Sequence, residues 1–408
     1  MLKLRQIFLS LILTLACLHA YGAADSLRFS VRGTVRDASG GKPLDVVSVS
    51  IPGTTFATVT NADGTFVIKS DIKPQFVSFS LLGYNSRTLP YEGEDLRVLM
   101  QKGSLELDAA SVVSGDPVAL VRYAMEHIVS NAPDGAELFD CFYRETVRKR
   151  QRFIYVSEAV TKVYKSPAGT RRRDRAAVVK SRLLTSPRRS DTLGVKVLGG
   201  PAMAVDLDIV KTRVMLLDES ELPLYKFELL PPDVIGGRSQ FVISFTPAME
   251  CPFALQKGVM YIDRQTFAFT RIKTSLDVSD PVKAINAMLV RRPAGLRFKP
   301  KEMTLTVNYS QDGGKCRLSY LKTEFRFNCD WRKRLLATDF TAVSEMVVTN
   351  RYTGADAVPI QREDEFSSRT SLADKTAEYS DPEFWADYNI IEPTANLEQA
   401  VGRLKKKK

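Results

Sequence analysis

Hydrophobic and polar residues alternate in short segments along the first part of the chain, from residue 27 to about residue 103. Residues 46–51 read Val-Val-Ser-Val-Ser-Ile, and the turns between such segments contain Pro52 with Gly53 and Asp63 with Gly64. Strands that recur about every 8–12 residues, with Gly, Pro, Asn and Asp between them, are typical of a small β-sandwich. We therefore expect residues 27–103 to form one.

A helical spacing of hydrophobic residues follows between residues 116 and 132. Asp116 and Pro117 form a plausible start of a helix, and Pro133 a stop. We expect a linking helix there, with His127 on or near it. A lone histidine on such a helix usually serves packing or faces solvent, because no second metal ligand or cysteine partner lies nearby in the sequence.

The alternating pattern returns over residues 139–355, where most segments show one hydrophobic and one polar side. Such segments are typical of antiparallel strands with one wet face. The expected fold class is therefore mainly β: a seven-stranded N-terminal sandwich, then a larger antiparallel, curved domain that could be half-barrel-like, with a few helices. Within it, residues 171–201 are rich in charge and predict mobile strands or an inserted loop.

Residues 356–408 are expected to form a C-terminal tail with short helices. Its first part, residues 356–377, is polar and predicts an extended or disordered crossing. Phe384, Trp385 and Tyr388 form an aromatic cluster that we expect to clip the tail back onto the sheet, and Leu397 to Leu404 could form a final helix.

The first 22 residues predict a secretory signal peptide. Lys3 and Arg5 precede a hydrophobic run and a small-residue site, and the run is too short to span a bilayer. Cleavage after Gly22 fits, as does cleavage after Ala24, and lipid modification of Cys17 is a third option. The expected location is the periplasm, or the periplasmic face of the outer membrane, of a Gram-negative-type bacterium.

Five spaced elements of the predicted sandwich share a specific pattern with a known family. They closely resemble the carboxypeptidase-regulatory-like domain, which implies a seven-stranded transthyretin-like sandwich. The elements are Val31-x-Gly33-x-Val35, Gly41-x-Pro43-Leu44, Val49-x-Ile51-x-Gly53-Thr54, Thr60 to Phe66, and Ser80-x-x-Gly83-Tyr84.

These residues have structural roles. Asp63 and Gly64 supply a tight turn with a positive φ, and Phe66 fills the core behind it. Gly83 and Tyr84 are expected to end a strand and lay a ring over the sandwich edge.

Peptidase chemistry is excluded by the histidine count. A zinc carboxypeptidase needs at least two histidine ligands with a carboxylate. After cleavage of the signal peptide, His127 is the remaining histidine. We predict no catalytic residue, no cofactor and no metal site.

A second resemblance covers residues 242–272. The pattern from Val242 to Phe245, with Gly258, Tyr261 and the strand around Phe269, resembles a β-hairpin in bacterial envelope proteins that carry the same N-terminal sandwich. It is also similar to a hairpin in the half-barrels of periplasmic lipoprotein carriers, which shelter acyl chains.

The positive charge narrows the choice of partners. The net charge of +11 falls to +9 when Lys3 and Arg5 leave with the signal peptide. Export argues against nucleic acid, so the basic runs, such as Arg171 to Arg173, are solvated loops or attract anionic lipid headgroups at a membrane surface.

Four cysteines remain after maturation: Cys141, Cys251, Cys316 and Cys329. Their spacing fits no metal knuckle. An oxidising compartment permits disulfides, and Cys316 with Cys329, in adjacent predicted strands, would be the pair; buried free thiols are the alternative.

Pairs of acidic residues are interpreted as surface charge rather than as acid–base pairs. They are Asp206 with Asp208, Glu219 with Glu221, and Glu363 to Glu365, all in polar, loop-like surroundings. The chain also contains no phosphate-binding loop and no nucleophile elbow.

The hypothesis that follows is a non-catalytic accessory protein of the cell envelope, which docks or binds an unidentified lipid, glycan or protein. A carboxylate-dependent hydrolase and a purely structural envelope protein are the alternatives. A candidate ligand face consists of aromatic residues that alternate along the strands, although core packing also accounts for them: Tyr225, Phe227, Phe241, Phe245, Tyr261, Phe267 and Phe269.

Overall fold

The computed structural model describes residues 29–103, 115–170, 172–188, 191, 200–213, 216–289, 294–331, 337–380 and 388–405. The predicted signal peptide, the alternative lipidation site at Cys17, and Phe384 and Trp385 lie outside these residues. Within them, no helix combines the length and the hydrophobicity needed to cross a bilayer.

Seven strands form the N-terminal sandwich: β1 (Phe29–Asp37), β2 (Ser48–Ser50), β3 (Ala57–Val59), β4 (Thr65–Ser70), β5 (Phe76–Ser80), β6 (Arg87–Pro90) and β7 (Leu96–Met100). One sheet has the order β4-β1-β7 and the other the order β3-β2-β5-β6. Val31, Val49 and Phe79, from the two sheets, share one buried cluster. The predicted seven-stranded sandwich is confirmed.

The turn before β4 shows why its residues are needed. Gly64 has a φ of 75°, a conformation that side chains disfavour. A Cβ atom on Gly64 would also lie 2.5 Å from the carbonyl oxygen of Val35. Phe66 is buried, with its ring centroid 5.5 Å from that of Phe79. The Tyr84 hydroxyl donates to Asp37 Oδ2 at 2.8 Å, which ties the segment after β5 to the end of β1.

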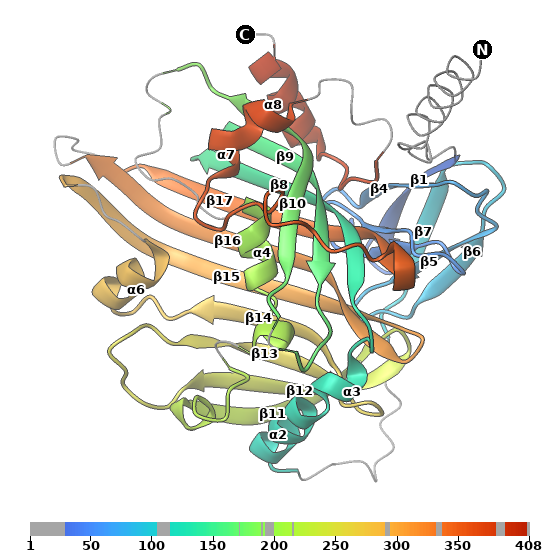
Figure 1. Ribbon diagram of the computed structural model, residues 1–408, viewed down its shortest axis with the longest axis horizontal. Helices are drawn as coiled ribbons and strands as arrows, with labels where there is room; N and C mark the ends of the chain where they lie inside the picture. The colour runs from blue at the N-terminus through green and yellow to red at the C-terminus, as the bar shows by residue number, and fades with distance from the viewer. Residues whose placement is uncertain are drawn as a thin grey trace, which may run out of the picture.

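Ten strands form the second, larger sheet (Figure 1). They are β8 (Glu137–Lys149), β9 (Arg152–Lys165), β10 (Arg175–Thr185), β11 (Tyr225–Ile235), β12 (Arg238–Pro247), β13 (Gln256–Asp263), β14 (Phe269–Leu276), β15 (Leu296–Asp312), β16 (Lys315–Trp331) and β17 (Asp339–Thr353). Their order is β10-β9-β8-β17-β16-β15-β14-β13-β12-β11, and all neighbours are antiparallel. β10 and β11 are the two free edges, so the sheet is open, and the predicted mainly-β class is confirmed.

The helices are short. They are α2 (Pro117–Glu126), α3 (Ile128–Asn131), α4 (Gly200–Asp206), α5 (Ile209–Thr212), α6 (Pro281–Met288), α7 (Leu372–Lys375) and α8 (Ala395–Lys405), with 3-10 turns η2 (Leu222–Leu224), η3 (Gly354–Asp356) and η4 (Thr376–Tyr379). Asp116 caps α2 by accepting a hydrogen bond from the backbone nitrogen of Val118, and Pro117 is its first residue. His127 ends α2 and precedes α3, with its ring 4.2 Å from that of Tyr123.

We call the face of the large sheet that carries Phe139, Ile243 and Val307 the inner face. One buried cluster joins it to Val178 of β10 and Phe227 of β11, so the sheet curls around a common core. Figure 1 shows α2, α3 and α4 on this side of the sheet. The inner face is therefore covered by the chain's own segments.

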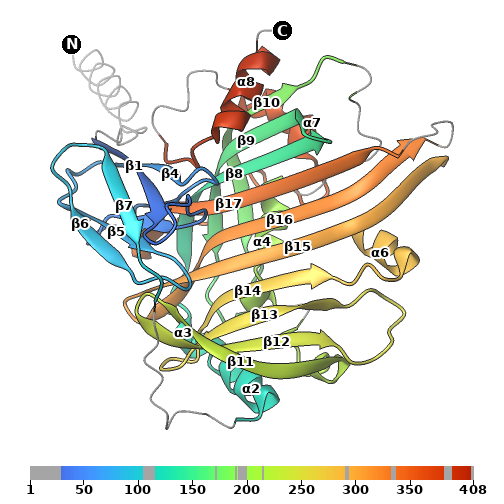
Figure 2. The ribbon, with the colours of Figure 1, turned by 180° about the vertical axis from the view of Figure 1, so that it is seen from behind.

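The outer face carries Phe142, Arg271 and Tyr320. Val59 of the sandwich packs on this face with Phe142, Tyr320 and Ile391, and the sandwich lies beside the strand ends in Figure 2. Leu397 and Leu404 of α8 pack on β9 and β10. The sandwich and the C-terminal helix thus lie against the outer face.

The structure corrects the expectation for the cysteines. Cys316 and Cys329 both lie on β16 and not in adjacent strands. Thirteen positions of an extended strand span roughly 40 Å, whereas a disulfide needs Cα atoms within about 7 Å. All four described cysteines are free thiols.

Two segments expected to be mobile or disordered contribute to the fold. Within residues 171–201, β10 pairs with β9 over most of its length. Within residues 356–377, Phe366 and Leu372 are buried in the inner core, and the Phe366 backbone nitrogen donates to the Ala176 carbonyl oxygen.

The described part of the tail packs on both the sandwich and the large sheet. The described contacts are made by Asn389, whose side chain hydrogen-bonds the backbone nitrogen and oxygen of Lys69 at 2.7 and 2.9 Å, and by the buried Ile391. The predicted final helix is α8.

Candidate functional site

The inner face forms a packed core rather than an open groove. Val121 of α2, Val205 of α4, Ile209 of α5 and Leu217 are buried against it. The cavity left beside α3 and α5 has a volume of about 70 Å³. Since one water molecule needs about 10–15 Å³ on this measure, the cavity holds a few waters and is too small for an acyl chain.

The predicted aromatic residues lie mainly within this core. Tyr261 is the exception, because its neighbours Met260 and Ile262 point to the inner face and successive side chains alternate. The ligand-binding role of the set stays a prediction. The residues at the inner core are Tyr225, Phe227, Phe241, Phe245 and Phe269, which are buried, and Phe267, which is partly buried.

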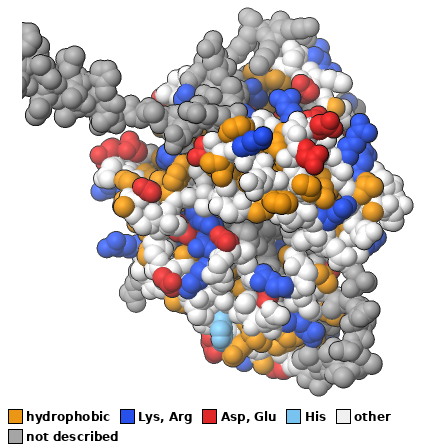
Figure 3. Space-filling model, turned by 90° about the vertical axis from the view of Figure 1, so that its right-hand side faces the viewer, with side chains coloured by type: hydrophobic (Ala, Val, Ile, Leu, Met, Phe, Trp, Pro, Cys, Tyr) orange, Lys and Arg blue, Asp and Glu red, His pale blue; other side chains and the backbone are white. Residues whose placement is uncertain are grey.

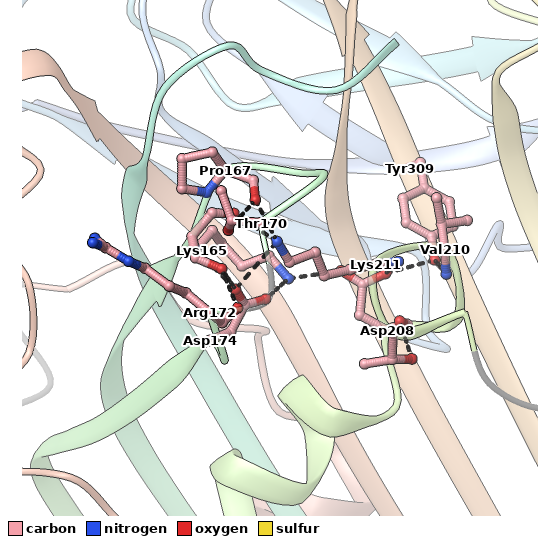
Figure 4. Close-up of polar contacts among 11 residues, drawn as sticks. Lys165, Pro167, Thr170, Arg172, Asp174, Asp208, Val210, Lys211 and Tyr309 are labelled. Atoms are coloured by element: carbon pink, nitrogen blue, oxygen red, sulfur yellow. Dashed lines mark hydrogen bonds and ion pairs between the residues drawn. The ribbon is translucent and has the colours of Figure 1, made fainter. Parts of the chain in front are cut away.

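A buried group of charges borders the small cavity (Figure 4). Lys165 Nζ, at the end of β9, lies 2.5 Å from Asp174 Oδ2 and 2.7 Å from Asp208 Oδ2. The Tyr309 hydroxyl donates to Asp208 Oδ1 at 2.8 Å, and Lys211 Nζ donates to the backbone carbonyl oxygen of Ser166. We call Lys165, Asp174, Asp208 and Tyr309 the inner charge cluster.

The charged groups of the inner charge cluster pair with one another. Burial alone would lower the pKa of Lys165, but the carboxylates of Asp208 and Asp174 raise it overall. Burial and Asp208 raise the pKa of Tyr309, so the phenol stays a neutral donor. Both carboxylates converge on one ammonium group, so they hold α5 to β9 and do not form an acid–base pair.

Asp208 therefore corrects the interpretation of the acidic pairs as surface charge. Its side chain is buried, and it caps α5 by accepting from the backbone nitrogen of Lys211. A buried carboxylate needs a partner, and Lys165, 43 positions away in the sequence, supplies it.

A larger space lies between the sandwich and the outer face. Its volume is about 550 Å³, within the range of roughly 300–1,000 Å³ of small-molecule sites. Ser48, Ser50 and Thr58 line it from the sandwich, and Asn308 and Ser319 from the sheet. We call it the crevice.

Charge in the crevice comes from two arginines and no acid. Arg238 is paired, with Nε 3.1 Å from Oδ2 of the buried Asp263. Arg271, on β14, has no ion pair or hydrogen bond to its guanidinium among the described residues. Burial lowers the pKa of Arg271, and the charges of Tyr261, Tyr320 and Asp233 partly oppose this shift.

The strand register explains where Arg271 points. Arg271 lies directly opposite Tyr261 on one side and Asn308 on the other, and Asn308 lies opposite Tyr320. These side chains form one row across four strands of the outer face. Ile272, the next residue, belongs to the inner core, so alternation directs Arg271 into the crevice.

Two buried polar atoms without a hydrogen-bond partner lie side by side here. Six such side-chain atoms occur among the described residues, and two of them, Arg271 Nε and Asn308 Oδ1, belong to directly opposed residues that line the crevice. An unpaired buried donor or acceptor costs about 1–3 kcal/mol, and a charged group more. This concentration makes the crevice, rather than the inner core, the candidate binding site.

Surface charge on the side drawn in Figure 3 is mixed. Lys and Arg side chains alternate there with Asp and Glu and with small groups of hydrophobic side chains. On that side, the positive net charge is not gathered into one basic patch that would favour a membrane surface.

The family comparison concerns one wall of the crevice. Residues 31–112 match the family model of the CarboxypepD_reg-like domain. The resemblance drawn from the sequence is confirmed. This CarboxypepD_reg-like segment contributes Ser48, Ser50 and Thr58 to the crevice.

Three solved structures show a weak similarity to part of the chain. A domain assigned to outer membrane lipoprotein sorting from Vibrio parahaemolyticus shares 10% identity over 61% of this chain and 97% of its own, with a TM-score of 0.27. A DUF1329 family protein from Desulfovibrio piger shares 10% over 57% and 94%, with a TM-score of 0.24. A LolA superfamily protein from Nitrosomonas europaea shares 11% over 60% and 98%, with a TM-score of 0.20. No curated protein sequence matches the chain.

Sequence reasoning did not identify Arg271 or Asn308. Each sits at a polar position of an alternating strand, which is the pattern of a solvated face. The CarboxypepD_reg-like domain covers that face, and its position cannot be read from strand periodicity. An arginine in the middle of a strand, flanked by Thr270 and Ile272, is the one available signal.

Proposed function

We propose that this protein is a non-catalytic binding protein of the bacterial cell envelope, which holds a small polar ligand in the crevice. The observation that carries the proposal is the crevice itself: a ligand-sized space whose walls combine hydroxyl and amide groups with aliphatic side chains, and which contains two unpartnered polar atoms, Arg271 Nε and Asn308 Oδ1. Ligand sites commonly lie between domains, and a small number of polar groups in them fixes the orientation of the ligand.

The chemistry of the walls favours binding over catalysis. The lining contains serines, a threonine pair, amides and guanidinium groups. General acid–base catalysis usually relies on a histidine or carboxylate near the reacting atom, and none lines the crevice. The walls therefore suit hydrogen bonding to a polar, hydroxyl-rich ligand such as a glycan.

Lipid binding on the inner face is the competing proposal. It would place an acyl chain against the predicted aromatic residues, as the resemblance to lipoprotein carriers implies. The ligand would have to displace α4, α5 and residues 216–222, which the inner charge cluster holds in place. This packing favours the crevice.

A pair of matched variants tests the proposal. Ser50 lines the crevice, and Ser78, its direct partner on β5, does not. Native mass spectrometry of the full-length protein, purified from its own envelope fraction, should detect a bound polar ligand on the wild type and on Ser78→Trp but not on Ser50→Trp. A bare wild-type chain, or an acyl lipid retained equally by all three proteins, would contradict the proposal.

A further inference from the structure

The side chains of Arg271 and Asn308 suit a ligand that carries both an anionic group and a hydrogen-bond donor. The guanidinium is a donor and a cation, and it is best matched by the two oxygens of a carboxylate or phosphate. Asn308 Oδ1 is a buried acceptor, which needs a donor. A simple anion would satisfy Arg271 and leave this amide oxygen unpaired.

The charge of the crevice limits the ligand further. Arg238 is neutralised by Asp263, which leaves the one unpaired cation of Arg271 among the described residues of the lining. Asp233 affects Arg271 electrostatically but forms no ion pair with it. One cation pairs with one negative charge, which favours a carboxylate over a dianionic phosphate monoester.

The remaining lining is partly aliphatic and partly hydroxyl-bearing. Ser48 and Ser50 can both donate and accept hydrogen bonds, whereas the hydroxyls of Thr58 and Ser319 already donate to backbone carbonyl oxygens and are left as acceptors. Tyr320 lies in the row beyond Asn308, and its hydroxyl is already bonded to Glu345 Oε1 at 2.9 Å. Its ring is buried against Val59 of the sandwich, so it belongs to the contact that holds the two walls of the crevice together.

We infer that the crevice binds an acidic sugar: a saccharide whose single carboxylate pairs with Arg271 and one of whose hydroxyls donates to Asn308 Oδ1. This inference rests on the proposed function and names the ligand class of the same site. The two walls of the crevice come from different parts of the chain, so the bound sugar would bridge the sandwich and the sheet.

Two probes that differ in one group test the carboxylate. D-Glucuronate and D-glucuronamide have the same ring and hydroxyls, but the amide is neutral. In titration calorimetry with the full-length protein, glucuronate should bind at least about tenfold more tightly than glucuronamide, the size of one charge-assisted hydrogen bond. Equal affinities would overturn the inference, as would tighter binding of glucose 1-phosphate or no binding of glucuronate.

Two variants locate the effect. Arg271→Gln should bring the affinity for glucuronate down to that for glucuronamide. Asn308→Asp places a carboxylate directly opposite Arg271, so it should also abolish the preference while leaving the protein at least as stable to heat. If Asn308→Asp loses the preference but keeps its thermal stability, misfolding cannot explain the loss.

The control is Arg326→Gln, which removes a half-exposed arginine of β16 that pairs with Glu302 outside the crevice. It should bind both probes like the wild type. A preference that survives in Arg271→Gln would overturn the inference. Because the Ser50→Trp experiment uses whatever ligand co-purifies, a neutral polar ligand lost from that variant would uphold the proposed function even where glucuronate fails.

Discussion

Lys165 and Arg271 are both largely buried cations of the same curled sheet, and their surroundings are opposite. Lys165 lies within 2.7 Å of two carboxylates, on the side where the chain's own helices cover the sheet. On the side where the sandwich leaves the crevice, Arg271 has no such partner in the described part of the chain. Buried charges that pair with one another hold a fold together, whereas an unpaired cation beside an open space is suited to binding a ligand.

The inner charge cluster should produce the largest effect when it is broken. Lys165→Met leaves Asp174 and Asp208 buried without a cation, and loss of one partner from a buried pair costs about 3–5 kcal/mol. We expect a loss near the upper end of this range in urea unfolding at pH 7.

The matched control for that experiment is Lys162→Met, on the same strand. Lys162 is partly exposed and pairs with Asp140 at 2.8 Å, so its loss should cost less than about 1 kcal/mol. Similar losses in the two variants would mean that the inner charge cluster does not hold the covering helices in place.

Glu145 gives a smaller, pH-dependent effect on the inner side. It is buried without a cation, and it accepts hydrogen bonds from the hydroxyls of Tyr143 and Tyr155 at 2.6 and 3.0 Å. Burial raises the pKa of Glu145 despite these bonds. A raised pKa in the folded state means that the stability contributed by this group is full below its unfolded pKa of about 4.3 and is lost as the pH rises through its folded pKa.

Glu145→Gln should therefore be more stable than the wild type at pH 8, by on the order of 1 kcal/mol, and the difference should vanish near pH 4. Urea unfolding across this range measures it. A wild type that becomes more stable than the variant as the pH rises would show that the tyrosine hydrogen bonds outweigh burial.

The sandwich, the linking helix and the strands follow from local patterns, and these could be predicted. Gly64 and Phe66 encode their turn and core contact within a few residues. Residues 116–132 break into two helices at His127, where the predicted single helix does not continue.

The candidate site could not be predicted, because its parts come from distant segments. Asp208 resembles surface charge until Lys165 and Tyr309 lie beside it. Arg271 resembles a solvated residue until the sandwich covers it. Strand periodicity tells which residues share a face, but it does not tell what packs on that face.

The smallest stability effect is expected at Arg271, and it separates the two cations most directly. Arg271→Met keeps the aliphatic stem between Tyr261 and Asn308 and removes a charge that has no partner among the described residues, so the free energy of unfolding should change by less than about 1 kcal/mol, or rise. Arg144→Met is the matched control, because Arg144 is buried and its Nε lies 2.7 Å from Glu158 Oε1; its loss should cost about 3 kcal/mol or more. Equal losses of unfolding free energy in Arg271→Met and Arg144→Met would mean that the folded protein itself depends on the Arg271 charge. That result would contradict the view that Arg271 is unpaired in the fold and available to a ligand.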